Sequence, residues 1–178
     1  MTTWNIDPVH SEIGFKVKHL MVSTVKGKFD EFSGTAVTAD DSFVDAKISF
    51  EANVASITTH QAQRDEHLRS SDFFDAEHFP KLTFVSKSFT KTGDNAFALV
   101  GDFTMRGVAK EITLSAIFNG IATNPMNNIR VAAFDVSGKI NRMDFGVKWN
   151  AAVEAGGVVV SEDVAFDIGI ELKEEATA

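Results

Sequence analysis

Apolar and polar residues alternate along most of the chain. In the segment 12–19, Ile13, Phe15 and Val17 fall on one face, and polar residues or glycine lie between them. The same alternation returns over 44–52, 97–105, 112–118, 132–140 and 164–172. A period of two is typical of β-strands that bury one face, and one-sided burial is typical of antiparallel sheets. The pattern predicts about eight or nine strands.

Only one segment has the composition of a helix. Residues 59–69 are rich in helix-forming side chains and contain neither Gly nor Pro, and Thr58 or Thr59 is a candidate N-cap. A second, short turn is expected over 70–79, and an irregular piece over 141–157. The chain is therefore predicted to be mostly strand, with a single substantial helix.

Such a series of strands fits two architectures, a closed up-and-down barrel and an open sandwich. Closure removes exposed strand edges, which promote aggregation, and a barrel of about eight strands either fills its interior with side chains or holds one small ligand. We predict an all-β fold: an antiparallel barrel of about eight strands, capped by one α-helix and short helical turns, in a single domain over residues 1–178. The sequence leaves open whether the barrel is filled or hollow.

The charge of the chain excludes some classes of partner. The 178 residues include 25 acidic and 17 basic side chains, which gives a net charge of −8. Proteins that bind nucleic acids cluster Lys and Arg against the phosphates, so no nucleic-acid partner is expected. Cysteine is absent, which excludes disulfides, thiolate metal ligands and a cysteine nucleophile. The N-terminal residues show no basic region leading into an apolar run, so a cytoplasmic location is expected.

The aromatic composition points to an oily interior. Sixteen Phe and two Trp supply every aromatic side chain, and Tyr is absent. Such rings bring few polar groups that need partners, which suits a hydrocarbon guest; the alternative is that the rings pack a filled barrel. An empty apolar lumen costs about 24 cal/mol per Å³, so a hollow barrel is expected to hold a guest. The residues predicted to line the lumen and contact a lipid are Phe15, Val17, His19, Phe29, Phe50, Phe84, Phe103, Phe118, Phe134, Trp149 and Phe166.

A second group of candidate residues lies on the predicted helix. His60, Arg64 and His67 follow the spacing i, i+4, i+7 and share one face. We interpret this face as a contact for the head group of the lipid, because Arg binds phosphate through paired hydrogen bonds; the alternative is a solvated face with structural ion pairs. The two histidines stand about 10 Å apart along a helix axis, and H-E-x-x-H is absent. No metal is predicted, and no cofactor other than a bound lipid.

Catalytic motifs are missing from the sequence. No G-x-S-x-G elbow, P-loop or G-x-G-x-x-G follows a predicted strand. We therefore predict a protein that binds a lipid without being an enzyme. The alternative is an enzyme acting on an isoprenoid or lipid substrate, with His67 and Asp65 as acid and base.

One predicted hairpin combines basic and apolar residues. Lys16, Lys18, Lys26 and Lys28 flank an apolar tip at residues 20–22. The lysines protect a strand edge in the simpler interpretation. In the other, the hairpin makes transient contact with an anionic membrane surface while a lipid is loaded.

Four segments, in order and at matching separations, resemble the YceI-like family of lipid-binding proteins. They are WNIDPVHSEIGFKVKHLMVSTVKGKF, ITTHQAQRDEHLRSSDFFDAEHFPKLTF, GDFTMRGVAKEITL, and INRMDFGVKWN together with GGVVVSEDV. The resemblance covers nearly the whole chain. It implies a lipocalin-like barrel extended along its axis, which holds a polyisoprenoid or fatty-acyl derivative and transports it.

The resemblance also bears on assembly and location. Members of the family are often dimeric, so a homodimer is expected, and many are exported to the periplasm. This sequence shows no leader, so the expected location of the protein remains the cytoplasm. The family motifs do not identify ligand contacts, so the lining and head-group predictions depend on the alternation and on the helix face.

Overall fold

The computed structural model describes residues 1–151 and 157–177. In this part of the chain, strands form most of the secondary structure. The strands are β1 Thr2–Ile6, β2 Glu12–His19, β3 Ser23–Phe29, β4 Phe32–Thr38, β5 Lys47–Asn53, β6 Ile57–Thr58, β7 Lys81–Lys91, β8 Ala96–Met105, β9 Val108–Thr123, β10 Arg130–Asn141 and β11 Asp163–Glu174. The helix α1 spans Ala62–Arg69, and short 3-10 turns span Val54–Ser56 and Arg142–Phe145.

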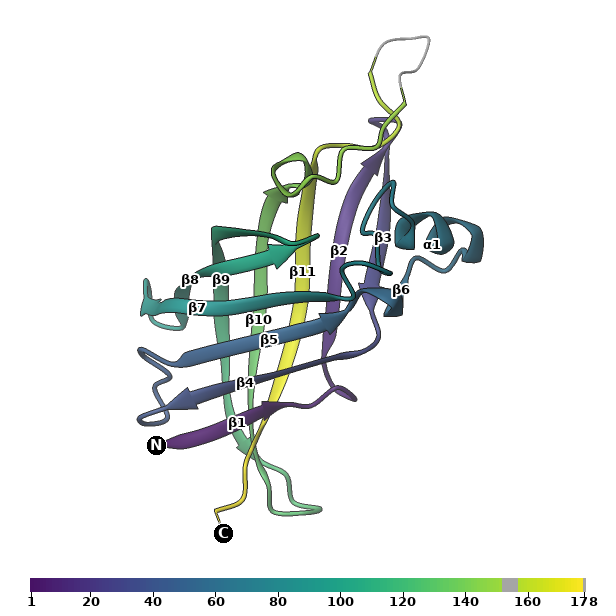
Figure 1. The fold of residues 1–178 in the computed structure, drawn as a ribbon. Helices are drawn as coiled ribbons and strands as arrows, with labels where there is room; N and C mark the ends of the chain where they lie inside the picture. The colour runs from purple at the N-terminus through teal and green to yellow at the C-terminus, as the bar shows by residue number, and fades with distance from the viewer. Residues whose placement is uncertain (152–156, 178) are drawn as a thin grey trace.

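Eight strands close into an antiparallel barrel (Figure 1). The order around the wall is β1-β4-β5-β7-β8-β9-β10-β11, and β11 pairs back to β1 through Trp4↔Glu174 and Ile6↔Leu172. Every neighbouring pair is antiparallel. The predicted all-β, lipocalin-like barrel is confirmed, and the open sandwich is not formed.

The remaining strands lengthen the barrel on one side. β11 pairs with β1 near its C-terminal end and with β2 over Ala165–Gly169, so β1 and β2 lie end to end along one edge. β3 then pairs with β2 as β4 pairs with β1, and β6 pairs with β3 as β5 pairs with β4. Three wall positions are thus each occupied by two strands in succession. We call β2, β3 and β6 the upper tier (Figure 1).

The helix lies beside the short strand β6. The residue before it, Gln61, is the N-cap, and the Gln61 side chain accepts a hydrogen bond from the backbone N–H of Arg64. The prediction that Thr58 or Thr59 caps the helix is wrong, because the Thr59 hydroxyl and N–H donate instead to the buried carboxylate of Asp65. Among the described residues, no helix has the length and apolar character needed to cross a bilayer.

An aromatic cluster fills the end of the barrel that contains β1. Trp4 and Phe43 have ring centroids 5.2 Å apart, Phe43 and Phe134 5.1 Å, and Phe118 and Phe134 4.9 Å. Phe89 packs on Phe134 at 6.0 Å. These residues come from strands and a loop on different sides of the wall, so the rings meet across the interior and seal this end.

Candidate functional site

Above the aromatic cluster, the interior of the barrel is hollow. A cavity of about 220 Å³ is lined by residues from all eight strands of the closed barrel. Apart from Thr35, Ser49 and Arg142, the lining residues are apolar or glycine. The upper tier, α1 and the segment after α1 also contribute, through residues such as Val17, Leu68 and Phe73. The cavity is therefore an oily compartment, large for the interior of a domain of this size.

Most residues predicted to line the lumen do so. Eight of them surround the cavity: Phe15, Val17, Phe29, Phe50, Phe84, Phe103, Phe134 and Phe166. The other three lie elsewhere. Phe118 stacks on Phe134 in the aromatic cluster, His19 forms a bridge with Val160 near the hairpin tip, and Trp149 packs on Phe73 at 5.2 Å. Whether any of these side chains contacts a lipid remains a prediction.

Glycines on the inner face explain why the barrel is hollow. Phe15 lies opposite Gly27 across the β2–β3 pair, and a Cβ at Gly27 would overlap its ring. Gly101 gives the same space to the ring of Phe84, and Gly138 to the side chain of Leu114. Because these positions lack side chains, their large neighbours lie along the wall rather than across the axis. The inward glycines thus keep the cavity open.

The predicted head-group residues lie outside the cavity lining. Arg64 donates through Nε to Thr59 Oγ1 and through a terminal nitrogen to the Thr59 carbonyl, both at 2.7 Å. His67 Nε2 lies 2.9 Å from Asp72 Oδ2, and His60 is exposed. From α1 itself, only Leu68 lines the cavity. The predicted shared face of three residues is not formed, because α1 begins only at Ala62 and His60 precedes its N-cap with a φ of +63°. Arg64 and His67 are on the helix, where both make local hydrogen bonds beside the cavity.

The structure separates the predicted acid and base. The Asp65 carboxylate accepts from the N–H of Thr59 at 2.8 Å and from its hydroxyl, whereas His67 is hydrogen-bonded to Asp72. His67 also contacts Trp149 edge-to-face, with ring centroids 4.9 Å apart. Asp65 is thus committed to fixing the start of the helix, and His67 to a contact with aromatic rings.

Arg142 is a residue that the sequence analysis missed. Its side chain is 3% exposed, and it donates to the carbonyls of Ser161 at 2.8 Å, Val147 at 2.7 Å and Trp149 at 2.9 Å. Burial lowers the pKa of Arg142, with a partial opposing effect of Glu162. The guanidinium joins both sides of the irregular segment to the end of β10. The signal was present, because Arg142 continues the inward alternation of 132–140 by one step.

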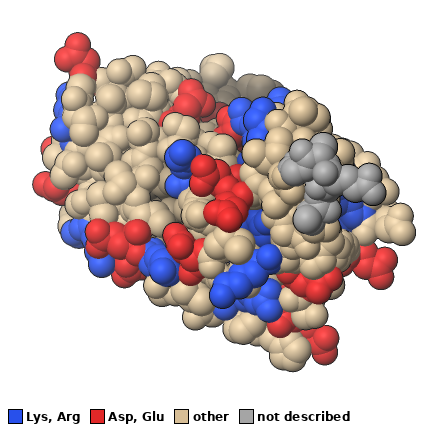
Figure 2. Space-filling view, turned by 90° about the horizontal axis from the view of Figure 1, so that it is seen from above, with Lys and Arg blue, Asp and Glu red and all other residues tan. Residues whose placement is uncertain are grey.

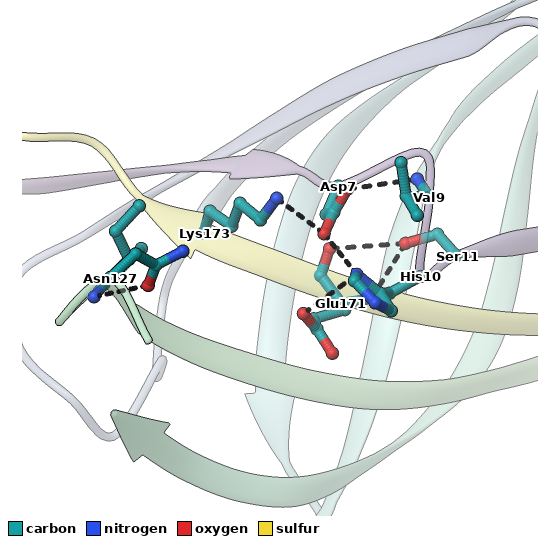
Figure 3. A network of polar contacts seen from close by, with 8 residues as sticks. Asp7, Val9, His10, Ser11, Asn127, Glu171 and Lys173 are labelled. Atoms are coloured by element: carbon teal, nitrogen blue, oxygen red, sulfur yellow. Dashed lines mark hydrogen bonds and ion pairs between the residues drawn. The ribbon is translucent and has the colours of Figure 1, made fainter. Parts of the chain in front are cut away.

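A polar network fixes the junction between β1 and β2 (Figure 3). Asp7 is 2% exposed and accepts from the Val9 N–H at 3.0 Å, and its Oδ2 lies 2.6 Å from His10 Nδ1 and 2.8 Å from Lys173 Nζ. Oxygen and nitrogen atoms of Asp7, His10 and Glu171 lie within 4.8 Å of one another, as in a metal site. The Lys173 ammonium binds the same Asp7 oxygen as His10, so the geometry is that of an ion-pair network.

The network makes the stability of the barrel depend on pH. Burial alone would raise the pKa of Asp7, but hydrogen bonds from His10, Lys173 and Val9 outweigh it and lower the pKa from 3.8 to about 2. This contribution is present above pH 3.8 and is lost as the pH falls toward 2. The hydrogen bond to Asp7 raises the pKa of His10 above 6.5, so its contribution is present below pH 6.5 and is lost at higher pH.

Asp7→Asn is expected to lower the free energy of unfolding by about 2 kcal/mol at pH 6. The loss should shrink as the pH approaches 2, where the wild-type carboxylate also becomes protonated. Urea unfolding between pH 2 and pH 8 measures the difference. Asp30→Asn, which removes an exposed carboxylate near Lys28, is the control and should have little effect. A deficit that does not change with pH would contradict the assignment.

Comparison with known proteins identifies relatives across almost the whole chain. The model of a family described as the YceI-like domain matches residues 4–172. A UPF0312 protein of Staphylococcus aureus (strain MSSA476) is 41% identical over 172 residues, which cover 96% of this chain and 97% of that protein. A UPF0312 protein of Staphylococcus epidermidis (strain ATCC 35984) is 43% identical over 171 residues, with the same coverage.

Solved structures share the barrel. The Campylobacter jejuni YceI protein is 31% identical and superposes with a TM-score of 0.75, covering 89% of this chain and 90% of that one. A polyisoprenoid-binding domain from Saccharophagus degradans superposes with a TM-score of 0.71, covering 97% of this chain and 98% of that one. The latter is only 14% identical and shows the fold alone.

Proposed function

Since the chain belongs to the YceI-like domain family, we propose that it binds a long-chain amphiphilic lipid in the barrel and carries it chemically unchanged. The guest is a polyisoprenoid or a fatty-acyl derivative. The observation on which the proposal chiefly depends is the apolar cavity, sealed at one end by aromatic rings and kept open by inward glycines. The fold is shared with a domain described as polyisoprenoid-binding, which supports the class of guest.

The energetics of the cavity favour a guest. At about 24 cal/mol per Å³, an empty volume of 220 Å³ costs about 5 kcal/mol, a large part of the stability of a typical domain. Each methylene group of a guest that enters it contributes about 0.8 kcal/mol. Hydrocarbon therefore fits this compartment better than water, which would find few hydrogen-bond partners there.

The lining also orients the guest. A polar head group would find almost no partner among the lining residues, so the tail lies inside and the head remains at the edge of the cavity. Leu68 lines the cavity, while Arg64 and His67 of the same helix lie outside the lining. A head group that emerges beside α1 therefore meets Arg64, His67 and the exposed His60. Homodimer formation, implied by the family, is part of the same proposal.

Purified protein is expected to contain about one lipid per chain. Mass spectrometry of an organic extract should detect it, and the delipidated protein should gain thermal stability when a prenyl or acyl probe is added, because ligands that bind the folded state stabilise it. A carrier returns the probe unaltered after incubation, whereas an enzyme gives a product. An extract without lipid, together with a melting temperature that no probe changes, would refute the proposal.

A further inference from the structure

The β2–β3 hairpin projects beyond the barrel (Figure 1), and the residues at its tip are apolar. Leu20, Met21 and Val22 are 43%, 58% and 83% exposed. Among the described residues, no other three consecutive large apolar side chains are exposed. Exposed apolar side chains that cluster in this way mark sites of interaction with proteins or membranes.

The conformation of the tip is costly for these residues. The N–H of Val22 donates to the carbonyl of His19, and the two residues between them, Leu20 and Met21, have φ values of +52° and +61°. A turn with two positive φ values favours Asn-Gly, and larger side chains are strained in it. Strained positions persist where the surrounding structure holds them, often at functional sites. The tip thus presents apolar groups at a cost in conformational energy.

The tip is held in place by the chain that follows the irregular segment. The N–H of Leu20 donates to the Val159 carbonyl at 2.9 Å, and the N–H of Ser161 donates to the Lys18 carbonyl at 3.1 Å. His19 forms a β-bridge with Val160. The tip is therefore a fixed projection rather than a free loop.

Basic side chains lie just below the tip. Lys18 and Lys26 are exposed, and neither forms an ion pair with a described residue, whereas Lys16 and Lys28 are 3.4 Å from Asp167 and 3.5 Å from Asp30. Seen from above, groups of Lys and Arg border the uncharged surface of this end, with Asp and Glu between them (Figure 2). An apolar tip with the exposed Lys18 and Lys26 just below it matches a bilayer that contains anionic lipids.

The hairpin also adjoins the cavity. Val17 in β2 and Val160, which lies beside the hairpin, both line it. The turn residues Leu20 and Met21 lie three and four residues beyond Val17, so at about 3.3 Å per residue the tip is about 10–13 Å beyond Val17, at the end of the molecule opposite the aromatic cluster. A surface bound at the tip is thus close to the end of the compartment that lies farther from the aromatic cluster.

We propose that Leu20, Met21 and Val22, with Lys18 and Lys26, form a docking site for an anionic bilayer surface. The apolar side chains enter the boundary between head groups and acyl chains, and the lysines meet the lipid phosphates. This inference rests on the proposed function, because docking brings the cavity to the surface from which a lipid is taken or to which it is delivered.

Co-sedimentation with vesicles tests the site. Binding is expected with equal parts phosphatidylglycerol and phosphatidylcholine, and much less with phosphatidylcholine alone. Each lysine contributes about fivefold, so Lys18→Gln/Lys26→Gln should weaken binding about 25-fold, while the matched Lys91→Gln/Lys110→Gln on β7 and β9 should not. Equal effects of the two double variants, or no preference for anionic vesicles, would overturn the proposal.

A second variant separates docking from folding. Leu20→Asn/Met21→Gly gives the turn its preferred residues, so the melting temperature should rise or stay unchanged while vesicle binding falls at least tenfold. Retention of vesicle binding by this variant contradicts the inference. Lipid in the organic extract reports on the cavity independently: a chain that binds vesicles but contains no lipid refutes the proposed function alone.

Discussion

Gly27→Ala is expected to reduce lipid affinity about 30-fold while leaving the barrel folded. The new methyl group would overlap the ring of Phe15, which must then turn toward the barrel axis. In the empty protein the ring enters free volume, so stability should change little. With lipid present, ring and tail compete for the same space, and overpacking costs about 2 kcal/mol, which corresponds to the stated loss of affinity. Titration of delipidated protein with a fluorescent acyl probe measures this affinity.

Two further variants isolate the ring as the cause. Gly27→Ala/Phe15→Ala should restore binding, because the displaced ring is removed. Gly169→Ala places a methyl group on β11 where nothing lies within 4 Å, so it should bind as the wild type does. If Gly27→Ala binds with unchanged affinity, the inward glycines do not set the width of the cavity.

Ala116→Leu is expected to stabilise the delipidated protein by about 2 kcal/mol and to abolish lipid binding. Ala116 is buried and lines the cavity, so the longer side chain extends into empty space. The gain corresponds to about three buried carbon groups at roughly 0.8 kcal/mol each. Chemical denaturation of delipidated protein gives the stability, and the probe titration gives the affinity.

Ala132→Leu provides the matched comparison. Ala132 is as fully buried as Ala116 but does not line the cavity, so the same substitution overpacks the wall and should destabilise by about 1–3 kcal/mol. The free energy of unfolding is expected to rise in Ala116→Leu and to fall in Ala132→Leu. Equal destabilisation at both would mean that the space beside Ala116 is not available to a hydrocarbon group.

Alternation predicts the regular parts of this fold well. The segment 12–19 coincides with β2, and 132–140 and 164–172 lie within β10 and β11. The segment 44–52 begins too early, because Asp45 has a left-handed φ and β5 starts only at Lys47. A single residue with a left-handed backbone conformation is enough to shift the start of a strand. The alternation of apolar and polar side chains does not reveal such a residue.

Residues of the site were predictable where a regular strand carries them. Phe118 has the correct phase and pairs with the inward Phe134, but it lies within the aromatic cluster at the sealed end of the barrel and not along the cavity, a position that periodicity does not reveal. Trp149 belongs to an irregular segment with no period to follow. The role of Gly27 depends on its cross-strand partner Phe15, and such pairings are set by tertiary structure rather than by local sequence.

Because the upper tier consists of strands separate from those below it, the length of the upper tier is independent of the closed end of the barrel. The aromatic floor belongs to the lower strands and the loop with Phe43, whereas β2, β3 and α1 rise above it. Residue pairs added to the β2–β3 hairpin would extend this side of the wall by about 3.3 Å per residue in each strand without changing the floor. Under the proposed function, the length of this one hairpin determines how far the wall extends along a bound hydrocarbon chain.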